Sequence, residues 1–139
     1  MMANKSNSII IAAAVLMVGG VALAQTQSSP VQPPPVKRTI VGKADVPNSN
    51  YETITAIVEI APGFKAGRHL HPGVVFCQVL EGEFWLAIDD QPEKIYKAGE
   101  QCSLPFKAIH NEGAVGSSPL KLVVTYVVEK GQPLAQPIK

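Results

Sequence analysis

The sequence predicts an all-β protein, a sandwich or barrel built from short strands. Segments rich in β-branched and aromatic residues recur along the chain, and glycine, proline and aspartate clusters separate them. No segment after Gln25 has the 3.6-residue apolar period of an amphipathic helix. Strands are expected at residues 51–60, 74–80, 83–88, 94–96, 101–104 and 120–128.

Each expected strand stops at residues that favour turns, and its alternation defines an inner face. In 83–88, Phe84, Leu86 and Ile88 form the apolar set, because strand side chains alternate with period two. In 74–80, Val75 shares a face with Cys77. The separating turns are expected at residues 61–63, 72–73, 81–82, 89–92, 98–99 and 116–119.

Residues 1–24 have the pattern of a secretory signal peptide. Lys5 precedes an apolar run at residues 9–24, which ends in Ala-Leu-Ala before Gln25. This run is short for a membrane span, which needs about 20 residues. We therefore expect cleavage after Ala24, export to the periplasm or the exterior, and no stable membrane insertion after cleavage.

The rest of the chain divides into three parts. Residues 25–38 are rich in proline and are expected to be a flexible segment, and residues 131–139 a flexible tail. Residues 39–130 form one small domain. Beyond residue 24 the chain carries 11 basic and 11 acidic side chains, because Lys5 is the one charged residue before it. This balance gives no basic surface for nucleic acid.

All three histidines of the chain fall into one pattern. His69 and His71 are one residue apart, so on a strand they point to the same face, and His110 arrives from a later segment. Neutral imidazole is a common ligand of Fe, Mn, Cu, Ni and Zn. The sequence predicts that His69, His71 and His110 bind one divalent metal ion.

The spacing around these histidines resembles the cupin superfamily. Gly63-x5-His69-x-His71-x10-Gly82 is similar to the first cupin motif, and Gly99-x5-Pro105 followed by His110 is similar to the second. The resemblance, closest to small single-domain quercetin-dioxygenase-like cupins, implies a double-stranded β-helix, the jelly-roll barrel. It also implies a glutamate ligand at the position of Val75. Valine cannot bind a metal, so the expected site is three histidines without a carboxylate.

Two classes of function follow from such a site. The first is metal-dependent chemistry on a small oxygen-rich substrate, either dioxygenase-like oxidation or an isomerase or lyase reaction. The second is a cupin that binds a metal or small ligand without turnover. No catalytic residue apart from the metal ligands is identifiable, and a homodimer would help so small a domain bury its core.

The two cysteines and the nearby cations are open to more than one interpretation. Cys77 and Cys102 are expected to be buried thiols rather than a disulfide, and Cys77 is also a candidate fourth metal ligand. Lys65, Arg68 and Lys107 either attract an anionic substrate or are solvated loop residues. Trp85, opposite the apolar face of its strand, is expected in a subunit interface or under the N-terminal segment.

Overall fold

The computed structural model describes residues 34–139, which form ten β-strands. The predicted signal peptide and the first part of the proline-rich segment lie outside these residues. Within 34–139, no helix has the length and apolar character needed to span a bilayer. The strands are β1 (Val36–Asp45), β2 (Tyr51–Ile60), β3 (His69–Leu70), β4 (Gly73–Glu81), β5 (Glu83–Ile88), β6 (Lys94–Lys97), β7 (Gln101–Leu104), β8 (His110–Ala114), β9 (Leu120–Glu129) and β10 (Gln136–Pro137).

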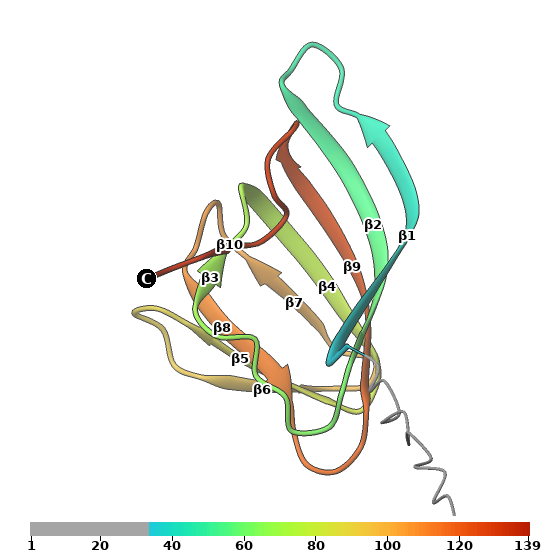
Figure 1. Ribbon diagram of the computed structural model, residues 1–139, viewed down its shortest axis with the longest axis vertical. Coiled ribbons are helices and arrows are strands. Elements are labelled where there is room, and N and C mark those ends of the chain that lie inside the picture. Colours follow the sequence, from blue (N-terminus) through green and yellow to red (C-terminus); the bar gives the residue numbers. More distant parts are fainter. Residues whose placement is uncertain (1–33) are drawn as a thin grey trace, which may run out of the picture. The chain divides into compact units, whose positions relative to one another are not determined.

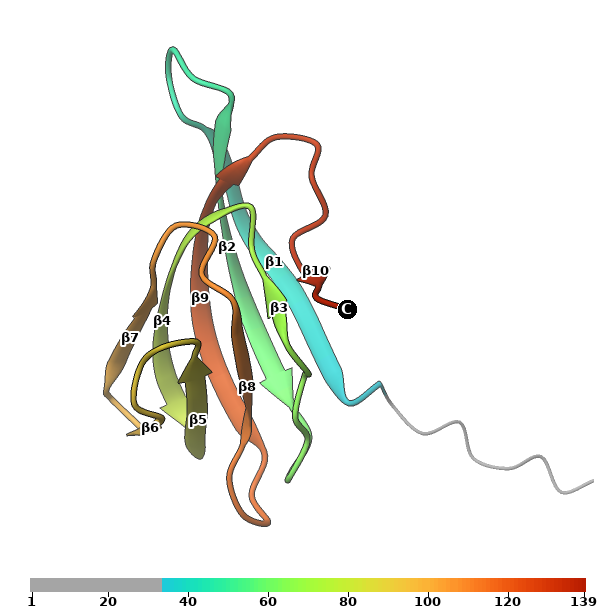
Figure 2. The same cartoon turned by 90° about the vertical axis from the view of Figure 1, so that its left-hand side faces the viewer.

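The strands form two five-stranded sheets that face each other (Figures 1 and 2). The first sheet has the order β1-β2-β9-β4-β7, and the second has the order β10-β3-β8-β5-β6. All strand pairs are antiparallel. The arrangement is the predicted double-stranded β-helix, and the chain crosses repeatedly between the two sheets.

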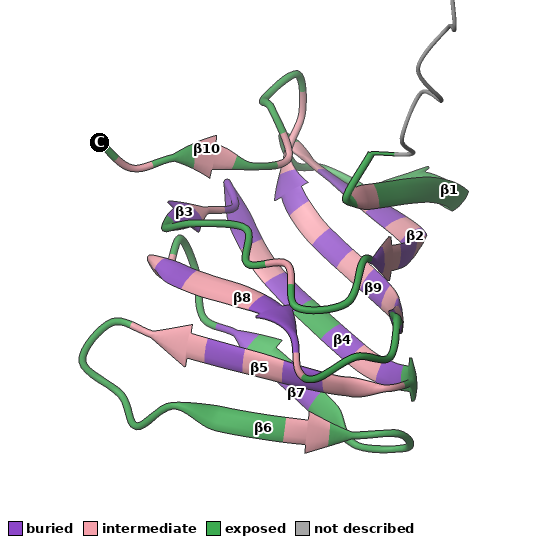
Figure 3. Cartoon of the chain, turned by 60° about the horizontal axis from the view of Figure 1, so that its bottom comes forward, coloured by how far each residue is buried: buried purple, intermediate pink, exposed green. Residues whose placement is uncertain are grey.

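The core lies between the sheets and follows the alternation of the sequence. In β2 and β9 every second residue is buried, which gives the striped ribbons in Figure 3. These two strands pair along their whole length, from Tyr51 opposite Glu129 to Ile60 opposite Leu120. Facing side chains such as Phe84 and Leu86 of β5 complete the apolar interior. Strands that alternate with period two have one apolar face, and the two sheets pack with these faces together.

The six predicted strands are all present, with ends shifted by no more than one residue. The structure adds four strands that the patterning did not indicate. Strand β1 begins at Val36, inside the segment expected to be flexible, and its edge position leaves it exposed, so it lacks a buried stripe. The tail contains β10, which pairs with β3. Two of the additions, β3 and β10, are two residues long, too short to show alternation.

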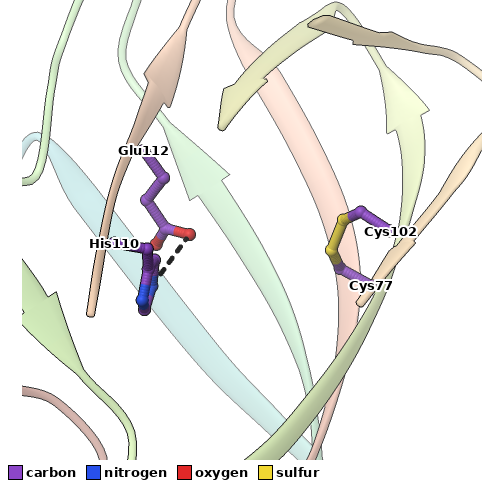
Figure 4. The surroundings of a disulfide bond; sticks show 4 residues. All are labelled: Cys77, Cys102, His110 and Glu112. Atoms are coloured by element: carbon purple, nitrogen blue, oxygen red, sulfur yellow. Dashed lines mark ion pairs between the residues drawn. A yellow bond between two sulfur atoms is a disulfide. The ribbon is translucent and has the colours of Figure 1, made fainter. Parts of the chain in front are cut away.

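The expectation of two free thiols is wrong, because Cys77 and Cys102 form a disulfide (Figure 4). The two residues lie directly opposite each other on β4 and β7, with their Cα atoms 5.1 Å apart. This separation is within the range that a disulfide spans. Sequence alternation placed both cysteines on inner faces but could not show that β4 and β7 are neighbours in this register.

Candidate metal centre

The three histidines lie at one end of the second sheet. His69 of β3 stands directly opposite His110 of β8, and His71 follows β3 in the short connection to β4. The ring centroids of His69 and His110 are 4.2 Å apart, and the His71 ring lies 5.1 Å from His69 and 5.0 Å from His110. All three side chains are buried. The structure thus brings together the three residues that the spacing singled out.

Each imidazole is oriented by a backbone carbonyl. A carbonyl oxygen can only accept, so each Nδ1 must carry the proton and donate it, which leaves the lone pair on Nε2. Histidine ligands of metals commonly have such a partner on the second nitrogen. The three bonds join His69 Nδ1 to Gly67 O at 2.8 Å, His71 Nδ1 to Leu134 O at 2.5 Å, and His110 Nδ1 to Ala108 O at 3.0 Å.

The Nε2 atoms of His69 and His110 lie close to a carboxylate. Glu112 places one carboxylate oxygen 3.8 Å from His69 Nε2 and the other 3.7 Å from His110 Nε2. Figure 4 shows Glu112 and His110 projecting from the same strand. Both distances exceed hydrogen-bond length, and the fully buried His110 Nε2 has no hydrogen-bond partner among the described residues. A buried polar atom without a partner is costly, and a metal ion would satisfy it.

The donor set fits one divalent metal ion. His69, His71, His110 and Glu112 each offer a ligand atom, and these atoms all lie within 4.8 Å of one another. Ligands at ~2.0–2.2 Å from one metal are at most about 4.4 Å apart, so small side-chain rotations suffice. Three imidazoles with one carboxylate suit Fe, Mn, Cu, Ni or Zn.

The histidine cluster includes a carboxylate that the sequence analysis did not expect, that of Glu112. The sequence held the signal: His110-x-Glu112 has the same spacing as His69-x-His71, which puts two side chains on one face of a strand. Residues 110–114 were not predicted as a strand, so this alternation was not applied to them. Strand β8 is short and polar, and apart from His110 only Gly113 and Ala114 are buried.

Burial prepares the histidines to be ligands. Desolvation lowers the pKa of His71 from its usual value of 6.5 to about 3, and the nearby imidazoles of His110 and His69 add to this effect. Desolvation likewise lowers the pKa of His110 to about 4. Burial raises the pKa of the Glu112 carboxyl, opposed by the charges of His69 and Arg38. At neutral pH the imidazoles of His71 and His110 are therefore uncharged and free to bind a metal.

Val75 faces the interior, as its place in the strand alternation predicts. It is 2% exposed and lines a small internal cavity together with His71 and Glu112. Cys77 lines the same cavity but is bonded to Cys102, so it is not the fourth ligand that the sequence allowed. The carboxylate therefore comes from β8, across the barrel from the strand that carries Val75.

A second cavity opens beside the histidines. Its volume is about 310 Å³, and His69 and Glu112 form part of its wall. The remaining wall includes the apolar Val58 and Phe64 and two cations, Arg38 and Arg68, and residues of the C-terminal segment close one side. A small molecule in this cavity would lie next to the candidate metal ligands.

Most of the other residues noted in the sequence lie away from the histidine cluster and the larger cavity. Lys65 places its Nζ atom 3.9 Å from the ring centroid of Trp85, whose Nε1 donates to Glu93 at 3.1 Å. Lys107 forms an ion pair with Glu129 at 2.8 Å. Of the three predicted cations, only Arg68 lines the larger cavity, and the sequence did not single out Arg38 from the unpredicted β1.

Two facing antiparallel sheets with a histidine and glutamate cluster inside them define a double-stranded β-helix protein with a potential metal centre. The cupin domain family matches residues 56–126, a stretch that includes all four candidate ligands. The chain belongs to the cupin family. A search of curated proteins gives no match.

Solved structures with the same fold come from several bacteria. A cupin-like protein from Thermotoga maritima is 21% identical with a TM-score of 0.59, over 74% of this chain and 75% of its own. A double-stranded β-helix protein from Klebsiella pneumoniae is 21% identical with a TM-score of 0.58, over 78% of this chain and 91% of its own. The DMSP lyase DddQ from Ruegeria pomeroyi is 17% identical with a TM-score of 0.55, over 64% of this chain and 44% of its own. At these identities the likeness shows the fold alone.

Proposed function

We propose that this cupin is a metal-dependent enzyme in which His69, His71, His110 and Glu112 hold one divalent ion. The observation that carries the proposal is the convergence of four ligand atoms within 4.8 Å around His110 Nε2, which no described residue hydrogen-bonds. Every histidine has its proton fixed on the far nitrogen by a backbone carbonyl, so the donors are arranged before any ion arrives.

The larger cavity favours turnover over a purely structural ion. A structural site is enclosed by protein ligands, whereas a catalytic one leaves room for a substrate. Here His69 and Glu112 both face a cavity of about 310 Å³, which would admit a small oxygen-rich molecule. A bound divalent ion would supply Lewis-acid activation of a substrate oxygen. The protein's own residues supply the apolar part of the cavity wall and the orientation of the ligand atoms.

The reaction class is either an isomerase or lyase reaction or a dioxygenase-like oxidation, and the metal would decide between them. Structural likeness to a DMSP lyase supports including lyase chemistry, although this chain covers less than half of that protein. A cupin that binds its ligand without turnover is the alternative. We further propose that the protein is exported, which the Cys77–Cys102 disulfide supports, since such bonds persist in oxidising compartments.

Metal analysis of the purified protein tests the centre. Wild type should hold about one equivalent of a divalent metal after loading and dialysis. His110→Ala should abolish this, and Glu112→Gln should weaken affinity by at least ~10-fold, since even loss of a ligand's supporting partner costs that much. Glu59→Gln is the matched control, because Glu59 pairs with Lys37 away from the centre. Equal metal content in wild type and His110→Ala would refute the proposal.

Oxygen consumption and product analysis then separate the classes of function. Iron-loaded protein incubated with small hydroxy and oxo acids should either consume oxygen or convert the acid without doing so. The first result assigns oxidation, and the second assigns lyase or isomerase chemistry. Binding without conversion by any loaded form would support the non-catalytic alternative.

A further inference from the structure

One cation at the larger cavity has no carboxylate partner among residues 34–139. Arg38 lies on β1 opposite Val58 of β2 and lines the cavity wall that also contains His69 and Glu112. Its Nε atom donates to the Tyr126 hydroxyl at 3.3 Å, and its Cζ atom lies 5.7 Å from the centre of that ring. Tyr126 is buried, so it is a fixed support that directs the guanidinium into the cavity.

The cations near Arg38 form ion pairs with carboxylates, whereas Arg38 forms none with a described residue. On the same strand, Lys37 pairs with Glu59 at 3.2 Å and Lys43 pairs with Glu52 at 2.8 Å. Arg68, the other cation of the cavity, pairs with Asp89. Throughout the described part of the chain, no carboxylate forms an ion pair with Arg38. A cation in a cavity wall that has no direct carboxylate partner attracts an anion.

The remaining donors of Arg38 suit a carboxylate. Because Nε is bonded to Tyr126, the two terminal nitrogens are left to form a pair of parallel bonds. This planar fork matches the two oxygens of a carboxylate. A phosphate dianion would call for a second free cation, and Arg68 is already paired with Asp89.

The other residues of the cavity wall indicate the chemical groups that the rest of the ligand carries. Val58 and Phe64 offer apolar contact for a short carbon body. His69 and Glu112 lie in the same wall, so a second oxygen group of the ligand would face the metal centre. Three neutral imidazoles and one carboxylate leave a divalent ion with a net positive charge, which also favours an anionic ligand.

We infer that the substrate is a small carboxylic acid with a second oxygen group, whose carboxylate is bound by Arg38 while the oxygen group faces the metal centre. This inference names the substrate class and rests on the proposed function. Arg38 acts as a specificity residue, and Tyr126 is a positioning residue that acts through it.

Calorimetric titration of metal-loaded protein tests the inference. The probes are the monoamides of succinate, glutarate and adipate, each compared with its own diamide, which has the same shape without the carboxylate. In wild type, at least one monoamide should bind about tenfold more tightly than its diamide, since a hydrogen bond to a charged group is stronger than one to a neutral group and solvent weakens this one. Arg38→Met keeps the side-chain stem and should reduce that ratio to about one.

Lys37→Met is the matched control, because it removes one positive charge from the neighbouring position while Lys37 pairs with Glu59 outside the cavity. It should leave the tenfold ratio unchanged. A ratio near one in wild type for all three pairs, a ratio that persists in Arg38→Met, or tighter binding of inorganic phosphate than of any monoamide would overturn the inference.

The metal content of each variant keeps the two proposals distinguishable. Arg38→Met should retain the metal of wild type, since Arg38 is not among the four candidate ligands. Protein stripped of metal is titrated in parallel. A preference for the monoamide over the diamide that depends on Arg38 and persists in wild type without metal would support the anion site even if the metal proposal failed. Full metal content with no preference would refute this inference alone.

Discussion

The two sheets of this barrel have the same number of strands and different roles. In the first sheet, β2 and β9 are ten residues each and pair without interruption, and their inner face is aliphatic apart from Glu52 and Tyr126. In the second sheet, strands of two to six residues carry His69, His110 and Glu112 on their inner faces. Long regular pairing supplies stability, and short strands held against it present the polar groups. Some substitutions should therefore change stability without changing metal binding, and others the reverse.

The largest effect on stability without an effect on metal binding should come from a substitution in the first sheet. Leu120 of β9 is buried and pairs with Ile60, so Leu120→Ala should lower the free energy of unfolding by about 2–5 kcal/mol through lost burial and the cavity left behind. Metal stoichiometry of the folded protein should not change. Urea denaturation with metal analysis measures both. Lys121→Ala, one residue along, should change stability by about 0.5 kcal/mol or less, and a loss of metal in Leu120→Ala would contradict the separation of roles.

The disulfide should also act on stability alone. It links β4 to β7 in the first sheet and closes a loop with a sequence separation of 25, so reduction should lower the free energy of unfolding by about 3 kcal/mol. Denaturation with and without dithiothreitol gives this value. In a Cys77→Ala, Cys102→Ala protein the reductant should have no effect. A reduced wild type as stable as the oxidised form would show that the bond does not hold the sheet.

The second sheet should respond differently when its tail is removed. A chain ending at Gly131 lacks the Leu134 carbonyl that orients His71, so metal affinity should fall about 10–100-fold. The first sheet stays intact, and the free energy of unfolding without metal should change by only about 1 kcal/mol, the order expected when one partly buried leucine side chain is removed. A chain ending at Ile138 is the control. Unchanged affinity in the shorter chain would mean that His71 needs no such support.

The second sheet should also make the free energy of unfolding depend on pH. The pKa values of His71 and His110 are lower in the folded protein than in the unfolded chain. Below about pH 6.5 the unfolded chain therefore binds two protons that the folded protein does not bind. The free energy of unfolding of the metal-free protein should therefore fall as pH falls from 6.5 toward 4.

The raised pKa of Glu112 acts in the opposite direction, because the folded carboxyl keeps a proton that the unfolded one has released. The slope should therefore be smaller than the roughly 2.7 kcal/mol per pH unit that two protons alone would give, at about 1.4 kcal/mol for each. Denaturation curves between pH 6.5 and 4 measure it. Leu120→Ala should show the same slope, and His71→Leu should show a smaller one. A stability that rises on acidification would mean that Glu112 outweighs the histidines.

The sequence predicted the first sheet better than the second for a physical reason. Tyr51–Ile60 and Leu120–Glu129 are long enough for alternation to repeat several times, so their inner faces were readable. The histidines were found because imidazoles at spacing two are uncommon and chemically specific. Glu112 was missed because its strand is short and polar, and the disulfide was missed because pairing of β4 with β7 depends on distant residues. Arg38 lies on an exposed edge strand without a pattern.

The bond from Leu134 to His71 has a consequence for how this protein can vary. A main-chain oxygen is present in every amino acid, so the identity of residue 134 matters little to the bond, whereas the number of residues between Glu129 and Leu134 fixes where that oxygen arrives. Substitutions within this connection should be tolerated except at Gly131, whose φ of 73° favours glycine, and single-residue insertions or deletions should not be tolerated. Natural variants of this barrel would then keep the length of the last loop while its composition drifts.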